Sequence, residues 1–180
     1  MEYGHIVLAS TKSGVVPSAI KFITKSQYSH SFITAPTIVG LPMCVEAAES
    51  GIDMIRFDDA YTQNAAENIE IWEVLISDEM KDKGLVAVFD KLETSYGFLE
   101  LPWFVWRWMN RLVGRDIKSQ NNWSKNGTIC SQLCRIYLTA TGLGSLFEGY
   151  GKGAVAPQDL SVVMNANPQL FKKVYSNFTT

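Results

Sequence analysis

One cysteine, Cys130, lies where local structure can convert a thiol into a nucleophile. The preceding segment Asn126-Gly127-Thr128 predicts a turn, and apolar residues at helical spacing after Cys130 predict a helix that begins there. A thiol at a helix N-terminus faces the positive end of the helix dipole and free backbone N–H groups, which lower its pKa. The same N–H groups can stabilise the oxyanion of a tetrahedral intermediate. Cys130 is therefore the candidate nucleophile.

A nucleophilic cysteine needs a base, and the chain has two histidines, His5 and His30. His5 lies within YGHIVLAS, residues 3–10, which predicts a short buried strand. We expect His5 to be a structural polar residue of that strand. His30 opens a second predicted strand, residues 29–35, and is the better candidate for the base.

Glu46 is the candidate group for orienting this base. Residues 29–35 and 43–48 predict two strands around PTIVGLP, a loop punctuated by proline and glycine. A hairpin centred near residue 38 places position 30 directly opposite position 46, on the same face of the sheet. The Glu46 carboxylate can then accept a hydrogen bond from one imidazole nitrogen and leave the other for the thiol.

The other two cysteines, Cys44 and Cys134, are expected to be buried and structural. An odd cysteine count without an export signal argues against a disulfide framework and favours a reducing compartment. Cys134 follows Cys130 by one helical turn, deeper in the predicted helix. A Cys-x3-Cys metal pair lacks further ligands in a chain with two histidines, so we expect neither a metal site nor a cofactor.

Hydrophobic periodicity predicts the elements that hold these residues. Strand patterns alternate with helical stripes along the chain, and no repeat or linker divides it. A few antiparallel strands with flanking helices predict one α+β domain over residues 1–180. Beyond the segments above, strands are predicted at 52–57 and 69–76, and helices at 15–26, at 78–93 and from Pro157.

Composition excludes several classes of protein. The 180 residues are 47% hydrophobic, enough for a full core, and the net charge of -2 argues against a nucleic-acid-binding protein. The N-terminal residues do not have a signal-peptide pattern, and no apolar run reaches the length of a membrane span. We therefore expect a cytoplasmic or otherwise soluble protein.

Taken in order, the short motifs resemble a known protein family. The motifs are Tyr28-Ser29-His30, Val45-Glu46-Ala47 and Ile129-Cys130-Ser131-Gln132-Leu133. This order is similar to that of the circularly permuted NlpC/P60 group of papain-like proteins, and more narrowly of the YiiX-like permuted cysteine amidases and peptidases. Weaker matches are Gly4-His5-Ile6-Val7, Tyr96-Gly97 and Pro157-x-Asp159-Leu160.

The resemblance implies a fold and a set of roles. The implied fold is a small antiparallel β-barrel or sheet packed against the helix that carries the cysteine. Cys130 is then the nucleophile, His30 the general base and Glu46 the orienting group. The Cys130 backbone N–H contributes to the oxyanion hole. Further candidates for the oxyanion hole and substrate cleft are Ser131, Tyr28 and Tyr96.

Two positions depart from the family pattern. Gln132 stands where the family usually has a glutamate, which we expect to affect helix packing more than chemistry. His5 stands where the family usually has an acidic residue, which can alter the edge of the cleft.

An aromatic segment, residues 98–112, bears on the substrate. Its tryptophans and phenylalanines are most simply explained as core residues, and a groove lining or a lipid or membrane-surface contact is the alternative. Three functions remain open at this point. They are a cysteine hydrolase acting on a peptide or cell-wall-type amide, a lipid acyl hydrolase or acyltransferase of the lecithin-retinol acyltransferase type, and a non-catalytic binding module.

Overall fold

The computed structural model describes residues 2–11, 21, 26–48, 50–63, 66–94, 110, 129–150 and 155–178. Tyr96 and nearly all of the predicted helix 15–26 and the aromatic segment 98–112 lie outside these residues. The strands are β1 (Ile6–Thr11), β2 (His30–Ile38), β3 (Leu41–Ala48), β4 (Gly51–Arg56), β5 (Ala66–Val74) and β6 (Phe171–Ser176). The helices are α2 (Phe57–Gln63), α3 (Asp78–Phe89), α5 (Cys130–Leu138) and α6 (Pro157–Ala166), with a π-helical turn at Thr139–Leu143 and a 3-10 helix at Gly144–Tyr150.

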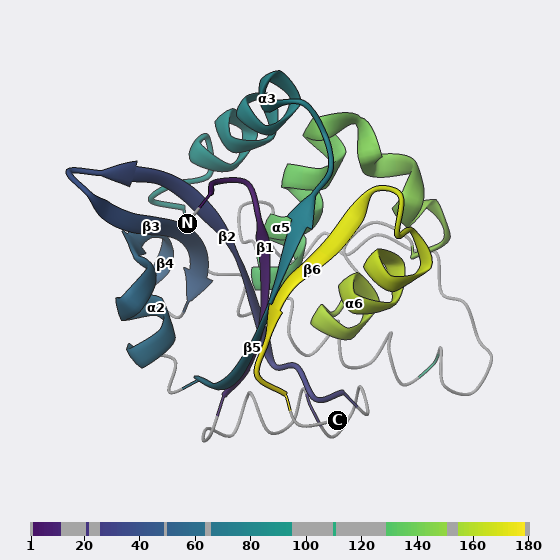
Figure 1. Ribbon diagram of the computed structural model, residues 1–180, viewed down its shortest axis with the longest axis horizontal. Coiled ribbons are helices and arrows are strands. Elements are labelled where there is room, and N and C mark those ends of the chain that lie inside the picture. The colour runs from purple at the N-terminus through teal and green to yellow at the C-terminus, as the bar shows by residue number, and fades with distance from the viewer. Residues whose placement is uncertain are drawn as a thin grey trace.

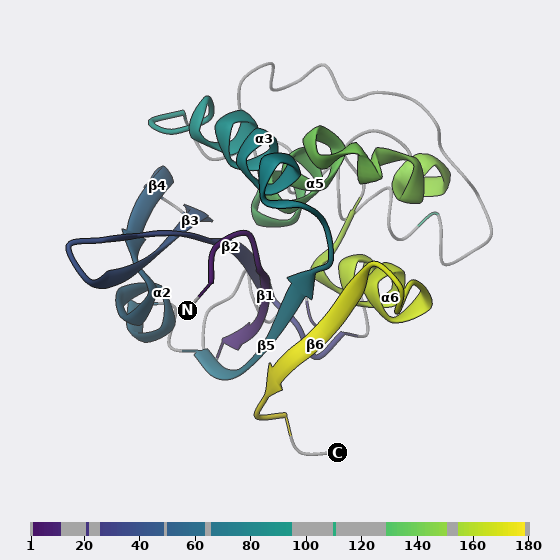
Figure 2. The ribbon, with the colours of Figure 1, turned by 45° about the horizontal axis from the view of Figure 1, so that its top comes forward.

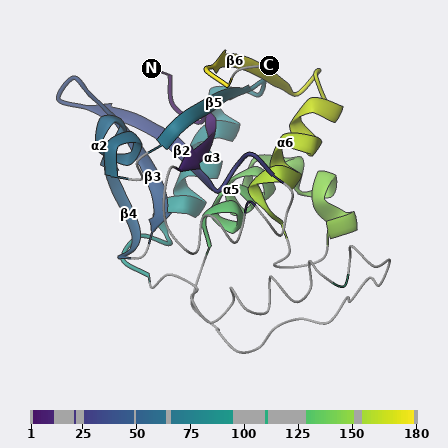
Figure 3. The same cartoon turned by 90° about the horizontal axis from the view of Figure 1, so that it is seen from below.

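Within the described residues, six strands form one sheet in the order β4-β3-β2-β1-β5-β6. Every neighbouring pair is antiparallel. The sheet curves, with α3, α5 and α6 on one side and α2 on the other (Figures 1 and 2). Seen from below, its strands follow an arc around α5 (Figure 3). The α+β class predicted from the sequence is confirmed.

The main core lies between the sheet and α5. Strand side chains alternate between faces, so Ile6 and Leu8 of β1 point to this side while Val7 points to the other. Leu133 and Tyr137 of α5 are fully buried against them. Burying such side chains stabilises the fold by about 1.5–3 kcal/mol each. This packing fixes the position of the N-terminus of α5, where Cys130 lies.

A smaller core covers the opposite face. Phe57 and Ala60 of α2 pack there with Val7, Phe32 and Cys44 of the central strands. The ring centroids of Phe32 and Phe57 lie 5.8 Å apart in an edge-to-face arrangement. The central strands are therefore buried on both faces, which explains the continuous apolar run of β1.

The helix ends follow from local chemistry. Pro157 occupies the first position of α6, as predicted, and the Asp159 carboxylate accepts a hydrogen bond from the Ala156 N–H at 2.9 Å. Gly142 has φ +87°, a left-handed conformation that favours glycine, and lies in the π-helical turn that follows α5. In the described part of the chain, no helix is long and apolar enough to cross a membrane.

The β2–β3 hairpin has a different register from the predicted one. Glu46 lies opposite Phe32, not opposite His30, because the turn is at Val39 and Gly40. Val39 has φ +50° and Gly40 φ +78°, so two adjacent residues adopt the left-handed conformation of a tight turn. The turn therefore lies one residue beyond the predicted centre, which shifts the pairing by two positions.

Other boundaries also differ from prediction. The first strand begins at Ile6, α3 ends at Phe89, and the strand predicted at 69–76 is β5, Ala66–Val74. The segment predicted as a strand over 52–57 ends at Arg56 because Phe57 begins α2. Neither α2 nor β6 was predicted.

Candidate active site

His30 and Glu46 meet diagonally across the β2–β3 ladder. His30 is two residues from Phe32, the partner of Glu46, so both side chains lie on one face. Diagonal neighbours are within reach of long side chains. His30 Nε2 lies 3.0 Å from Glu46 Oε2, and the two side chains are 10% and 5% exposed. The expected side-chain pair is therefore present, although the register differs, because a two-residue shift keeps both residues on the same face.

Cys130 completes the group from the other layer. Its sulfur is hydrogen-bonded to the His30 side chain, which leaves the imidazole between a thiol and a carboxylate. Because Nε2 contacts Glu46, Nδ1 is the nitrogen available to the sulfur. The structure therefore brings Cys130, His30 and Glu46 together in one line of contacts.

The three groups change one another's proton affinity. Burial alone raises the pKa of Cys130, but the His30 hydrogen bond and charge lower it below the value of an ordinary thiol. Burial alone lowers the pKa of His30, and hydrogen bonds with Cys130 and Glu46 outweigh this effect and raise it. A lowered thiol pKa beside a raised imidazole pKa favours the thiolate–imidazolium pair.

Backbone N–H groups add to this stabilisation. The N–H groups of Ser31, on β2, and of Ser131, on α5, donate hydrogen bonds to the Cys130 sulfur and also lower its pKa. Cys130 is the first residue of α5, and its N-cap is Ile129, whose apolar side chain makes no capping hydrogen bond. The N–H groups of this first turn can therefore receive negative charge from the sulfur or from a bound oxyanion.

The other two cysteines have the opposite environment. Cys44 and Cys134 are both fully buried. Burial raises the pKa of Cys134 to about 12, and burial with the nearby charges of Glu46 and Asp59 also raises that of Cys44. Both remain thiols near neutral pH.

Two of the predicted cleft residues have structural partners. The Ser131 hydroxyl is buried and donates to the Val155 carbonyl at 2.6 Å, so only its backbone N–H faces the sulfur. The Tyr28 ring is 3% exposed, and its hydroxyl donates to Glu70 Oε2 at 2.8 Å. Tyr96, the third, lies outside the described residues.

Glu70 is a residue that the sequence did not indicate. It is 3% exposed on β5 and accepts hydrogen bonds from Tyr28, from Trp72 Nε1 at 3.1 Å and from Lys173 Nζ at 2.9 Å. It thus anchors the segment that leads into His30. The signal was present but ambiguous, because Glu70 falls in the alternating run IEIWEV with nothing to show which face is buried.

A hollow of about 350 Å³ lies on the side of the sheet covered by α2. Apolar and aromatic side chains form most of its wall, and Cys130, His30 and Glu46 are not among them. The lining residues are Phe57, Asp58, Tyr61, Ile69, Ile71 and Tyr175.

Comparison with known proteins gives a structural relative. Searches against protein-family profiles and against curated proteins give no match. Among solved structures, the chain is similar to the crystal structure of the metalloprotein YiiX from Escherichia coli O157:H7. The TM-score is 0.57 with 18% sequence identity, over 99% of this chain and 98% of that one. At this identity the likeness shows a YiiX-like fold.

Proposed function

We propose that this protein is a cysteine hydrolase with a circularly permuted papain-like fold, in which Cys130, His30 and Glu46 form a catalytic triad. The observation that carries the proposal is the contact series from Cys130 through His30 to Glu46, buried at the N-terminus of α5. The nucleophile contacts the base, and the base contacts the orienting group, as thiol catalysis requires. The antiparallel sheet around α5 and the order of histidine before cysteine support the permuted fold.

Each residue has one task in the proposed reaction. The Cys130 thiolate attacks the amide carbonyl carbon, and the carbonyl oxygen becomes an oxyanion that accepts a hydrogen bond from the Cys130 N–H. The His30 imidazolium gives its proton to the leaving amine as the C–N bond breaks, which leaves a thioester on Cys130. His30, now neutral, takes a proton from water, whose oxygen attacks the thioester and releases the carboxylic acid. Glu46 holds the ring and favours its charged form.

The substrate class proposed here is a peptide or cell-wall-type amide. An amine is a poor leaving group until it is protonated, and the His30 imidazolium can supply that proton. The lipid alternative depends on the aromatic segment 98–112, which lies outside the described residues, so no structural observation favours it.

The test is release of new amine termini from a set of amide substrates. The wild-type chain, Cys130→Ser and Cys134→Ser are incubated with unmodified peptides and with cell-wall stem peptides, and products are identified by mass spectrometry. We expect cleavage by the wild type and by Cys134→Ser, and none by Cys130→Ser. Cleavage by Cys130→Ser at the wild-type rate would exclude the proposed nucleophile.

A second readout separates catalysis from binding. An activated thioester-forming substrate should raise the intact mass of the wild-type chain transiently, because His30-activated water removes the acyl group. In His30→Ala the mass increase should persist if it forms at all. Binding of peptides without any acyl adduct on Cys130 would instead indicate a recognition module.

A further inference from the structure

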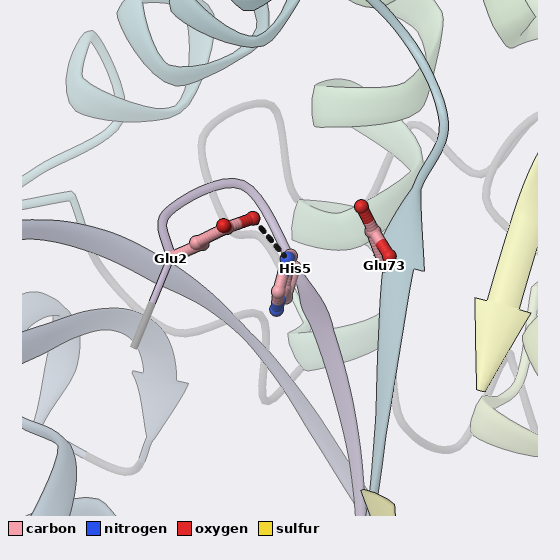
Figure 4. A group of neighbouring side chains, drawn as sticks. All are labelled: Glu2, His5 and Glu73. Carbon is pink, nitrogen blue, oxygen red and sulfur yellow. Dashed lines mark ion pairs between the residues drawn. The ribbon is translucent and has the colours of Figure 1, made fainter. Parts of the chain in front are cut away.

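A second cluster of chemically active side chains lies away from Cys130, at the other end of β1. Its members are Glu2, His5 and Glu73, shown in Figure 4 with the two carboxylates on either side of the imidazole. One ligand atom from each residue can be chosen so that all three lie within 4.8 Å of one another. His5 Nε2 and Glu2 Oε2 are 3.8 Å apart, which is too long for a hydrogen bond.

His5 supplies a separate observation. It is 6% exposed, and both its ring nitrogens are buried with no hydrogen-bond partner in the described part of the chain. A buried polar atom without a partner costs about 1–3 kcal/mol, so native structures rarely contain one unless a ligand, ion or water satisfies it. The imidazole without partners thus lies beside two carboxylates, with one possible ligand atom from each of the three residues within 4.8 Å of the others.

We propose that Glu2, His5 and Glu73 bind a divalent transition-metal ion, with Zn²⁺ as the best match to one imidazole and two carboxylates. Zinc accepts nitrogen and carboxylate ligands at about 2.0–2.2 Å, which places two tetrahedral ligand atoms about 3.4 Å apart. The ligand atoms, which lie within 4.8 Å of one another, need to approach by at most about 1.4 Å, which side-chain rotation can supply. Three protein ligands leave the fourth position for water.

The backbone holds these ligands close together before any ion binds. The β1–β5 register pairs Ile6 with Trp72, so its next step places His5 opposite Glu73. On the other side, the His5 N–H donates to Thr34 Oγ1 at 2.9 Å, and Thr34 Oγ1 donates to the Glu2 carbonyl at 3.0 Å. The ligands are therefore preorganised by strand pairing and by one shared threonine, which reduces the entropy cost of binding.

A turn at Gly4 brings Glu2 back over His5. Gly4 has φ +77°, its N–H donates to the Thr34 carbonyl at 2.8 Å, and the Tyr137 hydroxyl donates to its carbonyl at 3.0 Å. A Cβ at this position would lie 2.5 Å from the Tyr137 hydroxyl, so this turn needs glycine. The Glu2 side chain is 74% exposed, which gives an ion a path from solvent to the buried imidazole.

The charges around the cluster also suit a cation. His5 is buried beside both carboxylates, and a histidine binds metals in its neutral form. The two carboxylates balance the charge of a divalent ion. Lys81 opposes binding, because its positive charge acts on His5. Removal of this charge in Lys81→Met should therefore tighten Zn²⁺ binding.

The test measures Zn²⁺ binding to the untagged, chelator-treated full chain by titration calorimetry. We expect one Zn²⁺ per chain, with affinity at least about 100-fold weaker in Glu73→Gln, because loss of even an outer-shell partner of a ligand costs about 10- to 100-fold. Glu79→Gln changes an exposed glutamate on α3 and should match the wild type. Unfolding midpoints without metal establish that each variant is folded.

A second measurement identifies the ligands directly. The chain has two histidines, so imidazole resonances of a ¹⁵N-histidine sample are assigned with His5→Gln alone. Zn²⁺ should shift the His5 signals and leave those of His30 unchanged. Three results would overturn the proposal: no Zn²⁺ bound, a shift confined to His30, which would indicate binding at the Cys130 thiolate, or equal affinities in Glu73→Gln and Glu79→Gln.

Discussion

Three cysteines in one chain provide an internal comparison of thiol environments. All three are buried, with Cys130 4% exposed and Cys44 and Cys134 fully buried, so burial does not distinguish them. The difference lies in their partners, because Cys130 alone among the three shares a hydrogen bond with a histidine. Burial without a cationic partner keeps a thiol protonated, and burial with one stabilises the thiolate.

Iodoacetamide at pH 6 should therefore modify Cys130 and spare the other two thiols. The rate should rise as pH increases through the pKa of Cys130, which His30 and the backbone N–H groups lower below that of a free cysteine. The imidazolium, with a pKa of about 10, persists through this range and is lost only above it. Peptide mapping by mass spectrometry gives the rate at each cysteine. Equal, slow labelling of all three would mean that Cys130 is not activated.

His30→Ala should raise the pKa of Cys130 towards that of an unpaired thiol, about 8.5. The alkylation rate at pH 6 should then fall at least about 10-fold, since the loss of thiolate outweighs the higher intrinsic reactivity of a more basic sulfur. Cys134→Ala serves as the control that changes a neighbouring core thiol without touching the pair. An unchanged rate in His30→Ala would show that the helix N-terminus alone activates Cys130.

Glu46→Gln tests whether the carboxylate acts by its charge or by its hydrogen bond. A glutamine oxygen can still accept from His30 Nε2, so the ring orientation is kept while the charge that favours imidazolium is lost. We expect alkylation at pH 6 to slow by about 3-fold in Glu46→Gln, which corresponds to a change of about half a pKa unit. In Glu46→Ala, which also loses the hydrogen bond, the rate should fall further. A fall in Glu46→Gln as large as that in His30→Ala would assign the main role to charge.

Among the elements, α5 is placed by its contact with α3. Gly84 of α3 faces Tyr137 of α5, and a Cβ at Gly84 would lie 2.5 Å from Tyr137 Cε2 and 2.7 Å from Thr141 Cγ2. Tyr137 is fully buried and cannot move aside. The close approach of the two helices therefore needs a glycine at this position in the middle of α3, despite the low helix propensity of glycine.

Gly84→Ala should consequently lower the free energy of unfolding. Overpacking costs about 1–3 kcal/mol, and the gain in helix propensity returns about 1 kcal/mol, so a net loss of up to about 2 kcal/mol is expected. Gly149→Ala is the matched control, because a Cβ at Gly149 meets nothing within 4 Å. Urea unfolding measures both. A more stable Gly84→Ala would mean that α3 and α5 separate without cost.

The sequence predicted most strands and helices because their apolar patterns are strong, and it missed those whose stability comes from their neighbours. Residues 57–63 are too few for a helical stripe, and α2 is fixed by the contacts of Phe57 and Ala60 with the sheet. Strand β6 is an edge strand with one buried residue, Phe171, and two consecutive lysines, a composition typical of edges protected against aggregation.

The same distinction applies to the candidate sites. Cys130 and His30 were predictable because a helix start and a strand start are local features. The Ser31 N–H on the sulfur and the Glu70 contact with Tyr28 depend on which elements are adjacent. The cluster at His5 requires β1 to pair with β5, which are more than fifty residues apart in the chain. No local pattern specifies that neighbour.

Over the whole molecule, Glu70 joins parts that are distant in the sequence. It receives hydrogen bonds from Tyr28 before β2, from Trp72 on β5 and from Lys173 on β6. Glu70→Ala should lower the free energy of unfolding by about 2–4 kcal/mol, because buried donors lose their acceptor. Glu73→Ala, three residues on and measured without metal, should cost less than about 1 kcal/mol. If urea unfolding gave similar losses of free energy for Glu70→Ala and Glu73→Ala, the Glu70 hydrogen bonds would add no stability.

The two proposed sites share the sheet but lie towards opposite ends of β1, since His5 precedes this strand and His30 pairs with Ala9. Thr34 contacts His5, and His30 lies four residues away, about 13 Å along a strand. No residue belongs to both sites, so a cation at His5 acts on Cys130 only through space. At 0.15 M ionic strength the screening length is about 8 Å, and the effect should be small.

Zinc bound at Glu2, His5 and Glu73 should accordingly change the Cys130 alkylation rate by less than about twofold, and a chelator should have no effect on it. Carbamidomethylation of Cys130 should in turn leave the Zn²⁺ affinity unchanged. Rates are measured with one equivalent of Zn²⁺ in the wild type and in Glu73→Gln. Inhibition in both would mean that Zn²⁺ binds the thiolate itself. Slower alkylation of Cys130 in the wild type alone would mean that Zn²⁺ at the His5 site changes the reactivity of Cys130, which would contradict the prediction.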